Sequence, residues 1–223
     1  MLRETAEIEL EVAEFFRALT RERLEELRPV LATKRFERQR ALYFTGEPAD
    51  FLWVVRTGEV RLYKNSLDGR LATLETLYPG QAFGAISALG QDEYPTSAEA
   101  MTDGTAWCLP RKSVLALLRD EPQIAVEVLK IVSGRLHAAH EQMRSFAHDP
   151  APARLANALL HASREGEARV TRRALAETAG TTVETAIRVL RRFEREGLIR
   201  GAVGRVSVLN PDELRRMSGK RDL

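Results

Sequence analysis

The stretch of residues 170–199 places the strictest limit on the fold of this chain, because its spacing predicts two short helices joined by a tight turn. Thr171 can cap the first helix, and either Thr181 or Thr182 can cap the second. Gly180 supplies the turn between them. The positions expected to face inward are small or apolar: Leu175, Ala176 and Ala179, then Ala186, Val189, Leu190 and Phe193. This pattern predicts a helix-turn-helix.

The residues that follow predict a two-stranded wing. An apolar pair at 198–199 comes before Gly201 and Gly204, which flank a turn, and Val206 and Val208 alternate with polar positions. Alternation of this kind beside a glycine turn is typical of a β-hairpin. The last third of the chain is therefore expected to form a winged helix-turn-helix.

The first half of the chain has an apolar period of two. Short alternating runs at residues 51–55, 59–63 and 71–74 predict β-strands. Glycines at positions 46, 58, 69 and 80 put a turn signal after each strand, and Asp68-Gly69 is a typical hairpin turn. Strands and turns in this regular order predict an antiparallel β-roll.

Helical spacing is found on both sides of the predicted roll. Residues 11–28 form a helical lead-in, in which Thr20 can cap the second of two short helices. Ser113 is expected to open a further helix, and a long helix is expected from Pro122 to about residue 147. The Asp-Pro-Ala-Pro sequence at 149–152 ends the long helix and forms a short, stiff hinge.

The long helix carries two apolar stripes. Ile124, Val128 and Ile131 form one of them. The other follows Ala125 at alternating spacings of four and three, and its expected interface residues are Leu129, Val132, Leu136, Ala139, Met143 and Phe146. Since a helix with two apolar faces must cover both, we expect the longer stripe to form a homodimer interface.

Positive charge is concentrated toward the C-terminus. Residues 150–223 hold 15 Lys and Arg against 9 Asp and Glu, whereas residues 1–149 hold 19 against 23. A protein that binds a polyanion needs its positive charge in one place. The distribution therefore favours a basic face on the predicted winged helix-turn-helix.

The cysteine count and the hydropathy pattern exclude several classes of site. Cys108 is the only cysteine, so the chain has no internal disulfide, no Cys-pair zinc site and no cluster held by several thiolates; its apolar neighbours at 106–109 predict burial. No metal site is expected.

No apolar run reaches membrane-spanning length, and the acidic N-terminus lacks the features of a signal peptide. A cytoplasmic protein without a membrane partner is expected.

The second helix of the predicted motif offers a set of side chains to the major groove of double-stranded DNA. The expected base-reading residues are Thr182, Val183, Glu184, Ile187 and Arg188, and the expected phosphate contacts are Arg172, Arg173, Thr185 and Arg191. Arginine can make two hydrogen bonds to guanine, and glutamate can accept one from a cytosine amino group. The spacing of Glu184 and Arg188 also allows a simple surface salt bridge between them.

Five segments together carry a family resemblance: residues 58–60, residues 68–70, residues 79–84, the helix after Pro122, and residues 180–188. With them the chain resembles the catabolite activator and fumarate-nitrate regulator (CRP/FNR) family over nearly its whole length. The Thr-Val-Glu-Thr sequence followed by Arg188 is similar to the fumarate-nitrate branch. The resemblance implies an α+β fold with a jelly roll of the cyclic-nucleotide-binding type, a dimerisation helix and a winged helix-turn-helix. It also implies an activator that binds palindromic promoter sites and contacts RNA polymerase.

The resemblance implies three parts: a sensor-like domain at 1–120, the dimerisation helix and hinge at 121–149, and a DNA-binding domain at 150–223. The family's cyclic-nucleotide cassette has a glutamate and an arginine where this chain has Ala85 and Thr96, so cyclic AMP is not expected to bind. The residues expected to line an effector pocket are Phe83, Gly84, Ala85, Thr96, Ser97, Ala139 and His140. The alternative of a regulator that needs no effector stays open.

Two other kinds of protein remain as alternatives. One is a cupin-like enzyme, which would need histidine ligands on the roll, but the four histidines at 137, 140, 148 and 161 lie beyond it. His137 and His140 could bind haem or another ligand, or they could have a structural role only. The other alternative is a ligand-binding roll whose C-terminal helices only contact protein. No catalytic residue is assigned, and the chain is not expected to be an enzyme.

Overall fold

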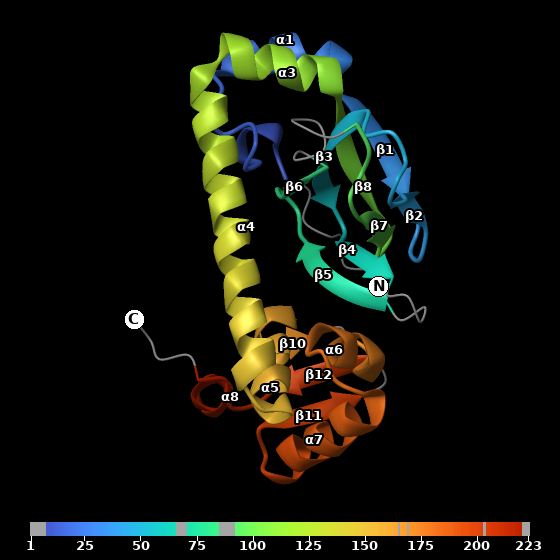
Figure 1. Ribbon diagram of the computed structural model, residues 1–223, viewed down its shortest axis with the longest axis vertical. Helices are drawn as coiled ribbons and strands as arrows, with labels where there is room; N and C mark the ends of the chain where they lie inside the picture. The colour runs from blue at the N-terminus through green and yellow to red at the C-terminus, as the bar shows by residue number, and fades with distance from the viewer. Residues whose placement is uncertain are drawn as a thin grey trace. The chain divides into compact units, whose positions relative to one another are not determined.

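The computed structural model describes residues 8–65, 71–84, 92–164, 166–168, 170–202 and 204–219. Contacts divide the chain into two compact units, residues 1–136 and 137–223 (Figure 1). Helix α4 (Pro122–His148) begins in the first unit and ends in the second. The predicted turn at 68–70 and the expected pocket residue Ala85 lie outside the described residues.

The first unit contains two antiparallel sheets, which confirms the predicted roll. One sheet has the strand order β1 (Ala32–Phe36), β8 (Gly104–Pro110), β3 (Phe51–Thr57) and β6 (Ala82–Phe83). The other has the order β2 (Ala41–Tyr43), β7 (Ser97–Ala100), β4 (Val60–Asn65) and β5 (Leu71–Leu77). Between β3 and β4, Gly58 has φ +82°, and a Cβ there would lie 2.6 Å from the Asp103 carbonyl oxygen, so this turn requires glycine.

Side chains alternate across β3, as the period of two predicts. Trp53 and Val55 point into the core between the two sheets. Leu52 and Val54 point to the opposite face, where they join a second apolar core formed largely by helices. Both faces of the strand are therefore buried, and the first unit has a sheet–sheet layer and a sheet–helix layer.

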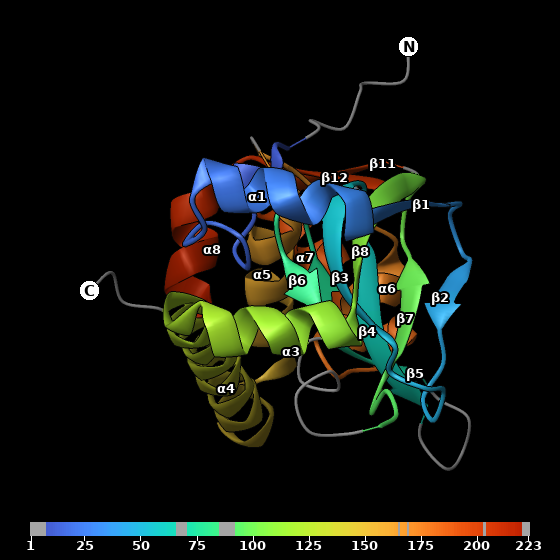
Figure 2. The same ribbon diagram turned by 90° about the horizontal axis from the view of Figure 1, so that it is seen from above.

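The helices of the first unit are short apart from α4. They comprise η1 (Leu10–Val12), α1 (Arg21–Leu27), η2 (Arg28–Val30) and α3 (Arg111–Asp120). Helices α1 and α3 run beside each other (Figure 1; Figure 2). The predicted cap at Thr20 is confirmed, but the prediction that Ser113 opens α3 is wrong. Strand β8 passes through Pro110 directly into α3, and the Arg111 amide donates to the Asp50 carbonyl, so no capping serine is needed.

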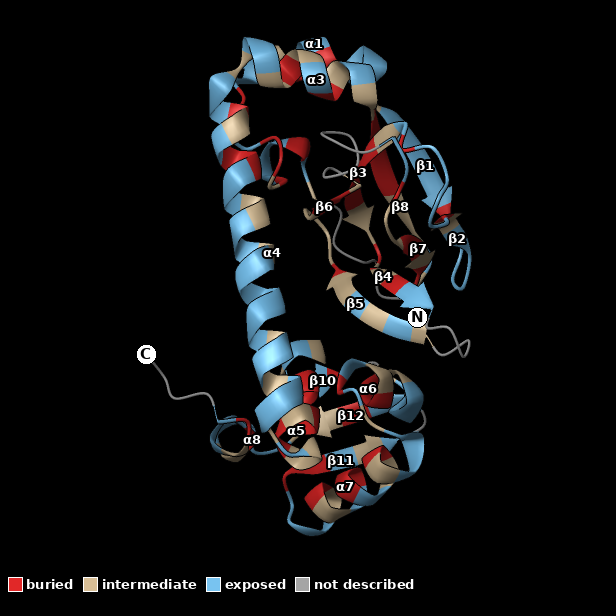
Figure 3. Cartoon of the chain, viewed as in Figure 1, coloured by how far each residue is buried: buried red, intermediate tan, exposed pale blue. Residues whose placement is uncertain are grey.

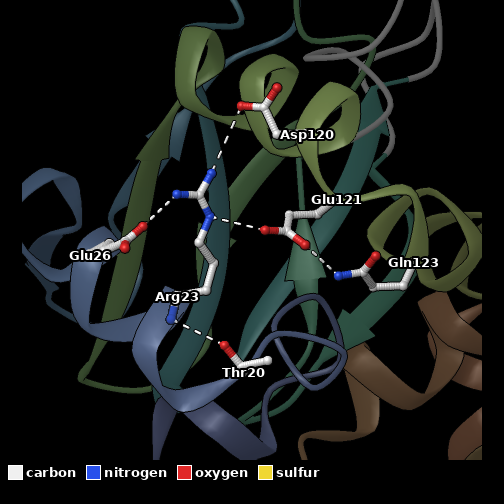
Figure 4. Close-up of polar contacts among 6 residues, drawn as sticks. All are labelled: Thr20, Arg23, Glu26, Asp120, Glu121 and Gln123. Atoms are coloured by element: carbon white, nitrogen blue, oxygen red, sulfur yellow. Dashed lines mark hydrogen bonds and ion pairs between the residues drawn. The ribbon is translucent and has the colours of Figure 1, made fainter.

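A charged cluster at Arg23 joins α1 to the corner between α3 and α4 (Figure 4). The Arg23 guanidinium contacts Glu26 at 2.5 Å and Glu121 at 3.2 Å, and Asp120 lies at 3.8 Å. The carboxylates raise the pKa of Arg23, with the hydrogen bond to Glu26 as the largest cause. Glu121 also accepts a hydrogen bond from Gln123. One arginine thus holds the start of α4 against the N-terminal helices.

The second unit surrounds one apolar core. Its elements after α4 are α5 (Ala151–Ala162), β9 (Ser163–Arg164), β10 (Glu167–Ala168), α6 (Arg172–Thr178), α7 (Val183–Arg195), β11 (Ile199–Ala202), β12 (Arg205–Val208) and α8 (Pro211–Met217). The sheet order β11-β12-β10-β9 includes the predicted wing hairpin. In the described part of the chain, no helix combines the length and the apolar character that crossing a membrane requires.

Candidate nucleic-acid interface

Helices α6 and α7 form the predicted helix-turn-helix. The Thr171 hydroxyl accepts a hydrogen bond from the Ala174 amide at 3.1 Å, and the Thr182 hydroxyl accepts one from the Thr185 amide at 3.2 Å. Each threonine therefore caps the N-terminus of its helix. Gly180 has φ +56°, the left-handed conformation that the turn between the helices requires.

Helix α7 has one buried face and one exposed face. Its buried residues are Ala186, Val189, Leu190 and Phe193. At 100° per residue, the positions opposite them are Glu184, Arg188, Arg191 and Arg195, and all four are exposed. We call these four residues the exposed stripe of α7. It presents one carboxylate near the start of the helix and three guanidinium groups after it.

Arginines of the second unit differ in whether a carboxylate already neutralises them. Arg173 pairs with Glu177 at 3.0 Å, and Arg192 pairs with Glu196 at 3.6 Å. Within the described residues, no hydrogen bond or ion pair engages the side chains of Arg172, Arg188, Arg191, Arg195 and Arg200. The unpaired charges include all three arginines of the exposed stripe, which leaves that stripe free to attract an anion.

The expected base-reading residues are not equally available. Glu184 and Arg188 are exposed, Val183 is 38% exposed, and Ile187 is half-buried. The Thr182 hydroxyl is occupied by its cap and by a 3.1 Å hydrogen bond to the Thr185 hydroxyl. The pKa of Glu184 is lowered, first by a hydrogen bond to the backbone amide of Glu184 itself and then by one to the Thr182 hydroxyl. Glu184 is therefore ionised at neutral pH and acts only as an acceptor.

The expected phosphate contacts also differ from one another. Arg172 and Arg191 are exposed and unpaired among the residues the structure describes, whereas Arg173 is paired with a carboxylate and Thr185 is half-buried. Arg195 was not among the residues expected from the sequence. Its spacing of seven from Arg188, two helical turns, is the signal that could have identified it.

The stripe expected to form a dimer interface is largely uncovered. Leu129 is 67% exposed, Leu136 55%, and Met143 61%, and Figure 3 shows that burial on α4 is concentrated in its first turns. Val132 is half-buried against the first unit's helical core, and Ala139 is exposed. Unpartnered apolar side chains of this size on one helix face are typical of an interaction surface.

Aromatic side chains fill the interior of the roll near the expected effector pocket. The rings of Tyr43 and Tyr94 are stacked with their centroids 3.7 Å apart. Phe83 is fully buried, and a Cβ on Gly84 would lie 3.1 Å from the Tyr94 ring. The Ser97 hydroxyl lies 3.0 Å from the Thr45 amide and 3.2 Å from the Thr45 hydroxyl. Phe83, Gly84 and Ser97 therefore all pack within the roll.

Arg135 on α4 contacts three groups of the first unit. Its guanidinium pairs with Glu14 at 3.4 Å and with Glu75 at 3.3 Å, and it donates a hydrogen bond to the Ala82 carbonyl. Burial raises the pKa of Glu75, and Arg135 opposes that rise. Three more residues were expected in the effector pocket. The side chain of Thr96 contacts the Tyr43 hydroxyl, whereas Ala139 and His140 belong to the other unit.

Comparison with known proteins gives consistent matches across both units. The model of the cyclic nucleotide-binding domain matches residues 33–121, and that of the Crp-like helix-turn-helix domain matches residues 153–217. The cyclic AMP receptor protein of Thermus thermophilus is 33% identical over 186 residues, which cover 80% of this chain and 86% of that protein. A CRP-like cAMP-activated global transcriptional regulator of Mycobacterium tuberculosis is 26% identical, covering 74% of this chain and 78% of that protein.

Solved structures show the same similarity. FixK2 from Bradyrhizobium japonicum superposes with a TM-score of 0.77 at 25% identity, covering 86% of this chain and 100% of that chain. A CRP-family transcriptional regulator from Thermus thermophilus superposes with a TM-score of 0.73 at 27% identity, covering 84% of this chain and 97% of that chain.

Proposed function

Because this chain belongs to the CRP/FNR family of DNA-binding transcription regulators, we propose that it acts as a homodimer that reads a palindromic promoter site. Each protomer inserts α7 into a major groove, and the two grooves lie about one turn of DNA apart. The relatives are regulators, which favours this function over the enzyme and protein-contact alternatives.

One observation carries the proposal: the exposed stripe of α7 presents three arginines that, in the described part of the chain, no carboxylate neutralises. Glu184 and Arg188 lie nearest the start of the helix and read bases, with Arg188 donating to guanine. Arg191 and Arg172 neutralise phosphates and supply affinity without sequence preference. Thr182 orients the helix start by accepting a hydrogen bond from the Thr185 amide, and Val183 and Ile187 offer apolar contacts to the same groove.

The homodimer forms through α4. The exposed side chains of Leu129, Leu136 and Met143 support this, since a second copy of the same stripe would cover them. Residues 121–149 then join the sensor-like part at 1–120 to the DNA-binding part at 150–223. In this arrangement a twofold axis in the protein matches a twofold axis in the DNA.

The roll works without cyclic AMP. Thr96 offers no positive charge for a cyclic phosphate, and Arg135 is already paired with two carboxylates. The stacked rings of Tyr43 and Tyr94 occupy space within the roll. The regulator therefore responds to a different effector or to none, and as an activator it contacts RNA polymerase through its exposed surface.

The proposal is tested by binding the full-length protein to a pool of random duplexes and sequencing the bound fraction over repeated cycles. We expect enrichment of a palindrome with a G·C pair in each half-site and an affinity that falls steeply with salt. Enrichment of an asymmetric site would contradict dimeric recognition, and no binding at low salt would contradict the function itself. Addition of cyclic AMP should change neither affinity nor site.

A further inference from the structure

One side chain, Arg154 on α5, connects the end of α4 to the turn of the helix-turn-helix. Its Nε atom donates to the Ala179 carbonyl at 2.7 Å, and one terminal nitrogen donates to the Gly180 carbonyl at 3.2 Å. The other terminal nitrogen donates to the Asp149 carbonyl at 2.8 Å. All three acceptors are backbone oxygens, and all belong to the second unit.

These acceptors lie at the C-terminal ends of two helices. Helix α4 ends at His148 and α6 ends at Thr178, so Asp149 and Ala179 follow them directly. The last carbonyls of a helix have no partner within the helix, and the helix dipole makes this end negative. The planar, charged guanidinium of Arg154 satisfies carbonyls at both ends at once, which the single ammonium of a lysine cannot do in the same geometry.

Phe146 strengthens the same junction. The Arg154 guanidinium lies over the Phe146 ring, 5.7 Å from its centroid. A Cβ on Gly180 would lie 2.9 Å from that ring, so Phe146 packs directly against the turn. Phe146 was expected in the dimer interface, but about half of its surface is covered within its own chain.

We infer that Arg154, with Phe146 beneath it, is a positioning residue that fixes α7 to the end of α4 and so sets the distance between the two DNA-reading helices of a dimer. The inference rests on the proposed function. It follows because α4 carries the dimer stripe, and the turn that Arg154 holds leads into α7, which begins three residues after Gly180.

Arg154 is not needed to hold α5 in the core. Leu155 and Leu159 on the same helix are fully buried, whereas Arg154 is half-exposed. Its replacement should therefore leave the second unit folded while removing the connection. Arg144 provides a matched control, because it pairs with the side chains of Glu141 and Asp149 at the same helix end without contacting the turn.

The test uses the full-length protein and the palindrome selected above, with its half-sites moved apart or together in steps of one base pair. A second duplex carries a single half-site. We expect the wild type and Arg144→Ala to prefer one spacing strongly. Arg154→Gln and Arg154→Lys should lose about tenfold in affinity at that spacing and keep their affinity for the single half-site within about twofold, because only the benefit of simultaneous binding is lost.

Two binding results would overturn the inference. One is an unchanged spacing preference in Arg154→Gln, and the other is an equal loss on the single half-site, which would give Arg154 a merely structural role. Hydrogen exchange without DNA gives an independent readout. Amides at 144–149 and 179–183 should exchange faster together in Arg154→Gln but not in Arg144→Ala. If these amides are unchanged, the inference fails even where DNA binding is normal. A wild type that binds no duplex would instead contradict the proposed function.

Discussion

Glu184 and Arg188 lie one turn apart on the exposed face of α7, and within the described chain they form no ion pair with each other. Such a pair does form at the end of the same helix, between Arg192 and the C-cap residue Glu196. The surface salt bridge that the spacing of Glu184 and Arg188 allowed is therefore not formed. Both charged groups remain available to a ligand, one as an acceptor and the other as a donor.

Replacement of Arg188 should separate base reading from charge. Arg188→Ala is expected to cost about 1–3 kcal/mol of binding free energy on the selected palindrome and little on random duplex. Arg191→Ala should weaken both and reduce the slope of log affinity against log salt by about one. Fluorescence anisotropy titrations at several salt concentrations measure both effects.

Arg215→Ala is the control for this pair, because Arg215 lies on α8 and is paired with Asp212 at 2.6 Å. It should bind both duplexes like the wild type. Equal losses for Arg188→Ala on palindrome and random duplex would assign Arg188 to phosphate and not to base contact.

The dimer stripe on α4 makes a second prediction. Leu136→Glu should dissociate the dimer, since it would place two unpaired carboxylates in an apolar interface. Ala138→Glu is the matched control, because Ala138 is exposed on nearly the opposite side of the helix. Analytical ultracentrifugation measures the outcome. A dimer that survives Leu136→Glu and dissociates with Ala138→Glu would place the interface on another face.

The burial of Glu75 predicts a dependence of stability on pH. Because burial raises the pKa of Glu75 in the folded state, the folded chain binds the proton more tightly than the unfolded chain. Stability should therefore fall as pH rises through the raised pKa, by about 1.4 kcal/mol for each unit of the rise. Glu14 and Arg135 face the same carboxyl and are unchanged in the test.

Glu75→Gln removes this titration. Urea unfolding at pH 5 and at pH 8 should show a smaller loss of stability in the variant than in the wild type. If the two proteins lose stability equally over this range, other groups control the dependence.

The turn at Gly180 predicts a large effect from one methyl group. Gly180→Ala would force a left-handed conformation on alanine and place its Cβ 2.9 Å from the Phe146 ring. We expect a loss of about 1–3 kcal/mol in the stability of the second unit, measured by denaturant unfolding. Gly197→Ala is the control, because its φ of +71° carries the same conformational cost while its Cβ would meet no atom within 4 Å. Equal losses in the two variants would show that the Phe146 contact adds nothing.

Cys108 should be unreactive in the folded protein. It is fully buried, and burial raises the pKa of its thiol to about 12. Since the thiolate is the reactive form, a thiol reagent at pH 8 should label Cys108 only in denaturant. Rapid labelling of the native protein would show that the roll opens.

The helix-turn-helix illustrates how much local spacing can predict. Thr171 and Thr182 each accept a hydrogen bond from the amide three residues later, and Gly180 forms the turn through its own left-handed conformation. The inward positions repeat with the period of a helix. The same kind of local pattern predicted the wing, the strands of the roll and the length of α4. The start of α3 did not, because the Arg111 amide is satisfied by Asp50, a residue far away in the chain.

The amino-acid sequence by itself determined the order of elements, the two-unit content of roll and winged helix-turn-helix, and which face of α7 is exposed. Only the tertiary structure decided which guanidinium groups already have partners. Arg135 pairs with Glu14 and Glu75, Arg173 pairs with Glu177, and Arg154 donates to three backbone carbonyls. The reason is physical. Periodicity and capping are short-range and leave a repeating trace in the chain, whereas a guanidinium is flexible enough to reach a partner far away in sequence, and no spacing rule records which one it meets.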